Sequence, residues 1–158
     1  MKERQLKILN RLFEKDELEV LELSKLTGVS EVTIRRDLID LDYQRLIKKS
    51  RGKTKISKIG KKQVLNNKRF REYYDEKQAL GIEAAQTIKS GESIIIDTGS
   101  TALQFAKALA GRDLENIKII TCSIMAAQAF QFVENIEVFV IGGVFRADRM
   151  IMSGTLAE

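Results

Sequence analysis

The sequence predicts an α/β protein in two parts, an N-terminal winged helix-turn-helix and a C-terminal parallel α/β layer. The first part is predicted by three helical patterns and a basic hairpin pattern within residues 1–57. The second is predicted by apolar strand patterns that alternate with helix patterns over residues 75–158. The charge of the chain also changes sign between the two parts.

Three helical patterns open the chain. Residues 3–14 place leucines at helical spacing between charged side chains, and residues 16–28 give a shorter helix that Gly28 ends. Ser30 is a suitable cap for a third helix, which runs to about Arg45. Three apolar side chains of this third helix share its buried side, namely Ile34, Leu38 and Leu41. Helix, short helix, tight turn and longer helix is the order of a helix-turn-helix.

A basic β-hairpin is expected after the third helix. Leu46 and Ile47 start one strand, residues 51–53 form the turn, and residues 54–57 return. This hairpin is the predicted wing. Residues 58–74, rich in Lys, Asn and Gly, have the composition of a basic linker between the two domains.

The charge is distributed unevenly. Residues 1–72 hold 20 Lys and Arg against 11 Asp and Glu, whereas residues 73–158 hold 7 against 11. Between residues 45 and 71 there are twelve basic residues and no acidic one. This asymmetry favours an N-terminal part that binds a polyanion. The alternative is a solvated basic face or a flexible basic tail.

Two adjacent arginines stand out on the third helix. At 100° per residue, Arg36 lies nearly opposite the buried side, with Thr33 on one flank and Arg35 on the other. A helix in the major groove has this arrangement, since an arginine there can bond guanine with two hydrogen bonds. The alternative is that both arginines are ordinary solvated residues, with Arg36 paired to Asp40.

The run Ser30-x-x-Thr33-Ile34-Arg35-Arg36-Asp37-Leu38 resembles the signature of the DeoR-type bacterial transcription regulators. Three later stretches, which begin at Glu76, Ile119 and Val138, are similar to the family's effector domain. The resemblance covers residues 3–158 and implies that Thr33, Arg35 and Arg36 contact DNA and that Asp37 is structural. With the cap and the wing, the candidate DNA-binding residues are Ser30, Thr33, Arg35, Arg36, Lys48, Lys49, Arg51 and Lys53.

Two positions depart from the family pattern. The wing tip is Ser50-Arg51-Gly52-Lys53, with one glycine where the family usually has two. Cys122 replaces the family's usual asparagine in the second loop of the α/β part. On residue chemistry, Cys122 is expected to be a small, half-buried side chain.

Three short loops are expected at one edge of the parallel sheet, where ligands of open α/β sheets bind. The first, Asp97-Thr98-Gly99-Ser100-Thr101, precedes a helix, whose N-terminus favours a phosphate. The alternative is that Ser100 only caps the helix and Asp97 only satisfies turn amides. The family resemblance implies a phosphorylated sugar as effector, in a domain like the sugar-phosphate isomerases. The candidate effector-binding residues are Asp97, Thr98, Gly99, Ser100, Thr101, Thr121, Cys122, Ser123, Gly142 and Gly143.

The chain stops soon after the third predicted strand, and the family's effector domain continues well beyond this point. The resemblance therefore implies that residues 75–158 form a C-terminally truncated effector domain. A sheet of three parallel strands is thin, and we expect it to expose an apolar edge or face.

The residue inventory excludes several kinds of chemistry. With no histidine and one cysteine, the chain has no internal disulfide, no Cys/His zinc site and no Ser-His or Cys-His pair. Asp97 is the sole acid-base candidate in the predicted cleft, so we expect no catalytic residues, no metal and no resident cofactor. No apolar run is long enough to span a membrane, and no signal peptide opens the chain, which predicts a soluble cytoplasmic protein.

The sequence thus favours a sequence-specific DNA-binding regulator, a repressor of carbohydrate metabolism genes with a sensor for a phosphorylated sugar. Its expected partners are a double-stranded operator and further copies of itself, because one helix-turn-helix reads only a half-site. Two alternatives remain open. One is a truncated regulator that binds DNA or a relative without responding to an effector, and the other is an enzyme like the sugar-phosphate isomerases.

Overall fold

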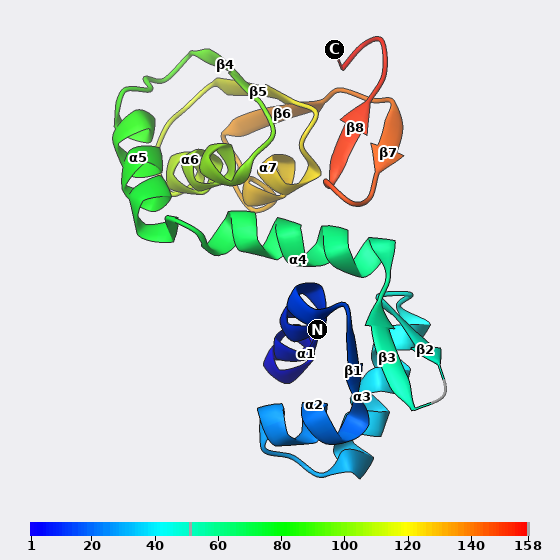
Figure 1. Cartoon of the computed structure of the whole chain (residues 1–158). Coiled ribbons are helices and arrows are strands. Elements are labelled where there is room, and N and C mark those ends of the chain that lie inside the picture. The colour runs from blue at the N-terminus through cyan, green and yellow to red at the C-terminus, as the bar shows by residue number, and fades with distance from the viewer. Residues whose placement is uncertain (51, 158) are drawn as a thin grey trace. The chain divides into compact units, whose positions relative to one another are not determined.

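The computed structural model describes residues 1–50 and 52–157. By internal contacts the chain divides into two compact units, Met1–Lys68 and Arg69–Glu158 (Figure 1). Each unit has its own hydrophobic core. The domain boundaries predicted at residues 57–58 and 74–75 stay predictions.

The first unit is a winged helix-turn-helix. Its elements are α1 (Glu3–Lys15), β1 (Glu17–Glu19), α2 (Val20–Thr27), α3 (Glu31–Tyr43), β2 (Ile47–Ser50), β3 (Lys53–Ile56) and the start of α4 (Lys58–Arg71). The strands form one antiparallel sheet in the order β1-β3-β2. The three helices and the hairpin predicted from the sequence are confirmed.

One core joins all parts of this unit. The inward-facing residues of α3 predicted from the sequence are all buried, and Ile34 and Leu41 are fully so. Apolar side chains from the other elements pack with them, namely Ile8, Leu9, Leu12, Leu18, Leu23, Leu46, Ile47, Ile56 and Val64. Burial of each such side chain stabilises the fold by roughly 1.5–3 kcal/mol, so the core holds α3 firmly against the rest of the unit.

Two elements differ from the prediction. Residues 17–19, expected to be helical, form β1, because Asp16 has a φ of 58° and interrupts the helical path. Leu18 then enters the core while Glu17 faces Lys55 of β3. The other difference is the linker, which is helical from residue 58 to 71 as α4.

Helix α4 is docked by its first turns. Ser57 Oγ donates to Arg45 O over 2.6 Å and accepts from Gly60 N over 3.0 Å. A side chain at Gly60 would meet Leu46 O at 2.1 Å, so glycine is required for this close approach. Val64 adds one apolar side chain to the core. A helix that buries so few residues has a polar composition, which explains why its sequence suggested a linker.

The second unit is a parallel α/β layer, as predicted. Its elements are α5 (Tyr74–Gln86), β4 (Ser93–Ile96), α6 (Ser100–Ala110), β5 (Ile117–Thr121), α7 (Ile124–Ala129), β6 (Ile136–Val140), β7 (Val144–Arg146) and β8 (Ile151–Ser153). Strands β4, β5 and β6 are parallel and adjacent in that order. Strands β7 and β8 form a separate antiparallel hairpin that the sequence patterns did not reveal.

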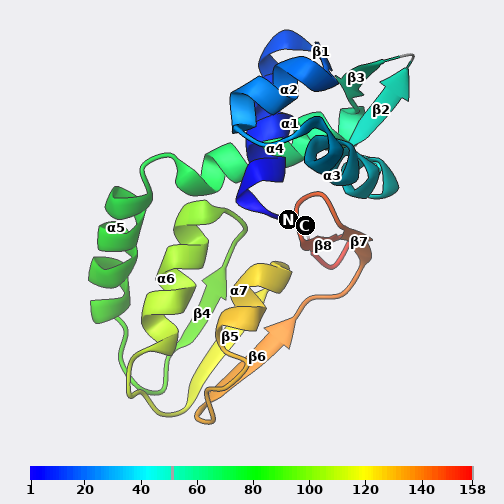
Figure 2. The ribbon, with the colours of Figure 1, turned by 90° about the horizontal axis from the view of Figure 1, so that it is seen from below.

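Helices α6 and α7 lie on one face of the parallel sheet, and α5 packs beside α6 (Figure 2). On that face lie buried side chains such as Ile96 and Ile119. On the other face Ile95, Ile120 and Phe139 lie side by side in register, and Ile95 is 77% exposed. This is the exposed apolar face expected of a sheet with three parallel strands.

Candidate nucleic-acid interface

The turn before α3 is fixed by hydrogen bonds of the backbone and of small hydroxyls. Gly28 ends α2 with a φ of 70°, and its amide donates to Ser24 O over 2.9 Å. Ser24 Oγ donates to Val29 O over 2.6 Å. Ser30 caps α3, since its Oγ accepts from Thr33 N at 3.4 Å and lies 3.1 Å from Thr33 Oγ1. Ser30 and Thr33 therefore orient the first turn of the helix, whatever else they contact.

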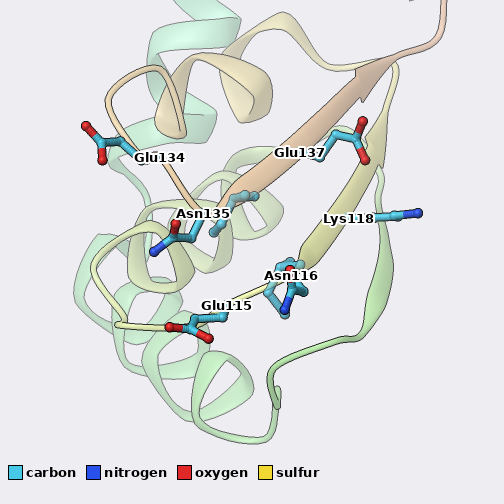
Figure 3. Close-up of a pocket in the computed structure, with 8 residues that line it drawn as sticks. Glu115, Asn116, Lys118, Glu134, Asn135 and Glu137 are labelled. Carbon is cyan, nitrogen blue, oxygen red and sulfur yellow. The ribbon is translucent and has the colours of Figure 1, made fainter.

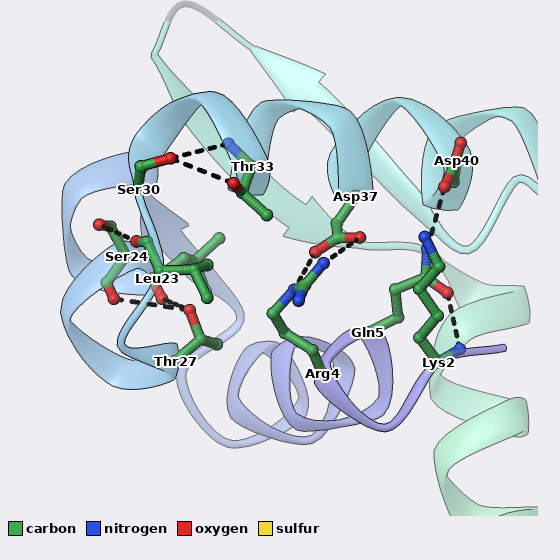
Figure 4. A network of polar contacts seen from close by, with 11 residues as sticks. Lys2, Arg4, Gln5, Leu23, Ser24, Thr27, Ser30, Thr33, Asp37 and Asp40 are labelled. Atoms are coloured by element: carbon green, nitrogen blue, oxygen red, sulfur yellow. Dashed lines mark hydrogen bonds and ion pairs between the residues drawn. The ribbon is translucent and has the colours of Figure 1, made fainter.

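A partly buried ion pair ties α3 to α1. The guanidinium of Arg4 donates to both carboxylate oxygens of Asp37, with Nη2 3.2 Å from Oδ1 (Figure 4). The side chain of Asp37 is 2% exposed and that of Arg4 is 30% exposed. One turn further along, Gln5 Nε2 donates to Asp40 Oδ2 over 3.2 Å. These contacts set the rotation of α3 about its axis, which agrees with the structural role expected for Asp37.

The opposite side of α3 carries Arg36. Arg36 is exposed and has no hydrogen-bond or ion-pair partner within residues 1–50 and 52–157. The pairing of Arg36 with Asp40, considered from the sequence, is absent from these residues, and Asp40 instead accepts a hydrogen bond from Gln5. Arg35 differs, since its Nη2 lies 3.3 Å from Glu31 Oε2. The structure thus leaves Arg36 free to bond a partner outside the unit.

A groove separates α3 from the wing. Arg35 lines it from the helix and Lys53 from the wing, with Leu38 and Ile39 between them. Its remaining lining residues are Val20, Lys49, Ser50, Gly52 and Thr54. Cations from two elements therefore meet over one concave surface, which is the electrostatic arrangement that attracts a polyanion.

The wing lysines have different surroundings. Lys48 is exposed and, in the part of the chain described, has no ion-pair partner. Lys49 Nζ lies 3.8 Å from Asp42 Oδ2. Lys53 Nζ and Lys55 Nζ lie 2.7 and 2.8 Å from the two carboxylate oxygens of Glu17. Predicted residue Arg51 lies outside the described residues.

Glu17 is the centre of this charge cluster. Hydrogen bonds from Lys53 and then from Lys55 lower the pKa of the Glu17 carboxyl to about 2, and the same contact raises the pKa of Lys53. The carboxylate also neutralises part of the wing's positive charge. The sequence patterns do not reveal this cluster, because they predict a helix at residues 17–19, and the pairing of Glu17 with Lys55 requires a strand there.

The candidate effector residues lie at the carboxyl ends of β4, β5 and β6, as the topology requires. Thr121 and Ser123 are buried there. Thr121 Oγ1 donates to Ile96 O over 2.6 Å and accepts from Ser123 N over 3.0 Å, while Ser123 Oγ caps α7 at Ala126 N. These hydroxyls therefore hold the first two loops together.

The remaining effector candidates are more accessible. Asp97, Thr98, Gly99, Gly142 and Gly143 are exposed, and Ser100, Thr101 and Cys122 are half-buried. Gly99 has a φ of 139°, which glycine adopts readily. A side chain at Gly143 would meet Ser153 O of the β7–β8 hairpin at 2.4 Å. Contact of these residues with an effector stays a prediction.

A second depression lies at the opposite end of the sheet, where β5 and β6 begin (Figure 3). Its charged lining consists of Glu115, Glu134, Glu137 and Lys118. Three carboxylates against one ammonium make this surface unfavourable for a phosphate. It contains none of the residues predicted to bind an effector.

A winged helix-turn-helix unit followed by a parallel α/β unit is the arrangement that the resemblance to the DeoR-type regulators implies. The comparisons with known proteins agree. The family model of the DeoR-like helix-turn-helix domain matches residues 4–59, and that of the DeoR C terminal sensor domain matches residues 72–158. The chain belongs to the DeoR family. No helix among the described residues is long and apolar enough to cross a bilayer.

Several curated relatives align along nearly the whole chain. The HTH-type transcriptional regulator GolR of Listeria innocua is 35% identical over 98% of this chain and 60% of its own length. The repressor GlcR of Bacillus subtilis is 29% identical over 97% of this chain and 58% of its own length. The lactose phosphotransferase system repressor of Lactococcus lactis is 29% identical over 96% of this chain and 60% of its own length. The chain therefore spans about three-fifths of these relatives, which are regulators and not enzymes.

Breaking the Arg4–Asp37 pair is expected to destabilise the first unit. Asp37→Asn keeps the shape of the side chain but leaves Arg4 without its counter-charge. We expect the free energy of unfolding, measured in urea, to fall by about 2–3 kcal/mol. This loss is smaller than for a fully buried pair because Arg4 is partly exposed. Glu14→Gln breaks the exposed pair with Arg11 and should cost less than about 0.5 kcal/mol. Equal losses in the two variants would contradict a stabilising role for the buried pair.

The lowered pKa of Glu17 predicts a pH dependence of stability. Since the folded-state pKa of about 2 lies below the ordinary 4.5, ionised Glu17 stabilises the fold above about pH 4.5. This contribution is lost as the pH falls from 4.5 towards 2. In urea unfolding, the advantage of the wild type over Glu17→Gln should be larger at pH 6 than at pH 3. A difference that does not change with pH would contradict the ion pair.

Proposed function

We propose that this chain is a sequence-specific DNA-binding repressor that acts in the cytoplasm as a homo-oligomer. The observation that carries the proposal is the exposed Arg36 on the outer side of α3, opposite the core and beside a basic groove, with no partner in the described part of the chain. Its membership of the DeoR family supports the same conclusion.

Helix α3 would lie in the major groove with its first turns against the base edges. Arg36 can donate two hydrogen bonds to N7 and O6 of a guanine, which is the commonest specific contact of this kind. Lys48, exposed on the wing, would bind phosphate. A single α3 covers one half-site, so two copies on a two-fold related operator give the affinity and specificity that repression requires.

The second unit would sense a phosphorylated sugar. The support is its match to the family's sensor domain, together with three short polar loops at the carboxyl edge of the sheet. One relative is named a lactose phosphotransferase system repressor and another a putative aga operon repressor, which favours regulation of carbohydrate metabolism genes. An effector would act by binding the DNA-competent and DNA-incompetent states with different affinity.

Replacement of Arg36 tests specific recognition. Arg36→Ala is expected to weaken binding to a selected operator by about 1–3 kcal/mol and binding to random duplex by much less. Binding can be measured by fluorescence anisotropy on the two duplexes at one salt concentration. Arg11→Ala, which removes an exposed arginine of α1, serves as the control for charge alone. Equal losses of Arg36→Ala on operator and random DNA would show a phosphate contact instead of base recognition.

A panel of sugar phosphates tests the sensor. One of them is expected to change the operator affinity by about 5- to 150-fold, the usual range of allosteric coupling. The unphosphorylated sugars serve as controls, since the helix N-terminus at Ser100 is expected to favour the phosphate. If sugar phosphates bind without changing operator affinity, the protein is a regulator without an effector response, as the alternative from the sequence holds.

A further inference from the structure

The outer side of α3 carries a row of exposed apolar residues along the helix, before and after Arg36 in the sequence. Val32 is 62% exposed, Ile39 is 59% exposed and Tyr43 is 90% exposed. Val32 lies four residues before Arg36, and Ile39 and Tyr43 lie three and seven residues after it. All four side chains therefore share one side of the helix. We call Val32, Arg36, Ile39 and Tyr43 the outer strip of α3.

The outer strip is unlike scattered surface hydrophobics, which are common and need no explanation. Its members follow the helical repeat, and they lie opposite the buried residues Ile34 and Leu41. Val32 is also a β-branched residue in an exposed helical position, where helix propensity favours other residues. Burial against its own unit therefore does not account for Val32.

The chemistry of the strip matches the major-groove edge of a particular base. Among the four bases, only thymine presents a methyl group in the major groove, whereas the other bases present hydrogen-bonding atoms there. A valine in a helix has one strongly preferred rotamer, so its two methyl groups form a rigid apolar surface. Val32 is the second residue of α3, in the turn that enters the groove in a helix-turn-helix complex.

We propose that Val32 is a specificity-determining residue that contacts the C5 methyl of a thymine near the guanine bound by Arg36. This inference rests on the proposed function and adds the identity of a second base. The Cβ atoms of residues one turn apart are about 5–6 Å apart. Base pairs are stacked about 3.4 Å apart, so the thymine lies within about two base pairs of that guanine.

The position of Val32 depends on contacts already described. The Ser30 cap fixes the first turn of α3, and the Arg4–Asp37 pair fixes the rotation of the helix. Ile39 belongs to the same strip, but it also lines the groove beside the wing. Val32 does not line that groove, and Tyr43 is the last residue of α3, far from the turn that enters the major groove. Val32 is therefore the apolar member of the strip that is best placed for a base contact.

The test uses deoxyuridine, which lacks only the methyl group of thymine. The full chain first selects its preferred duplex from a random pool. The guanine bound by Arg36 is then the one whose replacement by 7-deazaguanine weakens binding of the wild type but not of Arg36→Ala. Each nearby thymine is then replaced by deoxyuridine. We expect one replacement to weaken wild-type binding about two- to fivefold, as burial of one methyl group favours binding by about fourfold. The same replacement should leave the affinity of Val32→Ala unchanged.

A matched control is provided by Val144, which is 59% exposed in the second unit. Val144→Ala removes the same two methyl groups and should keep the full wild-type response to deoxyuridine. The inference is overturned if Val32→Ala keeps that response at every thymine, or if no thymine near the guanine responds in wild type. A loss of dimerisation in Val32→Ala with an unchanged thymine response would instead assign the strip to contact between copies. If no duplex is selected over random DNA, the proposed function fails as well.

Discussion

The ion pair between Arg4 and Asp37 is the contact on which the DNA-reading surface depends. Asp37 lies in the middle of α3 and is almost completely buried, so its charge is tolerated only because Arg4 donates to both of its oxygens. An apolar residue at this position would pack, but it would not fix the rotation of the helix as a bidentate pair does. With Asp37 turned inward, Arg36 and Val32 are turned outward.

The wing shows that a basic sequence does not translate directly into free positive charge. Glu17 bonds both Lys53 and Lys55, and Asp42 lies near Lys49. Lys48 has no such neighbour among the described residues. A phosphate that approaches the wing therefore meets Lys48 directly, and it competes with a carboxylate for Lys53.

In the second unit, the same hydroxyl-rich loops that suggested a ligand site also maintain the sheet. Thr121 forms hydrogen bonds with Ile96 and Ser123, and Ser123 forms one with the start of α7. The backbone of the β7–β8 region continues this network, since Met152 N donates to Cys122 O over 2.8 Å. The accessible groups of the edge are therefore those of the first and third loops, around Asp97 and Gly142.

The sequence by itself determined α1, α3, the wing hairpin and the parallel sheet with its helices, because their apolar periodicity is local and strong. It did not reveal α4, whose polar composition suggested a linker, or strand β1. It also determined that Arg36 lies opposite Ile34 and Leu41, since helical geometry alone fixes that angle. Only the tertiary structure decided which charges are paired. The contacts of Glu17 with Lys53 and of Arg4 with Asp37 join residues more than thirty positions apart. Such pairings depend on how the elements pack, and no local pattern encodes them.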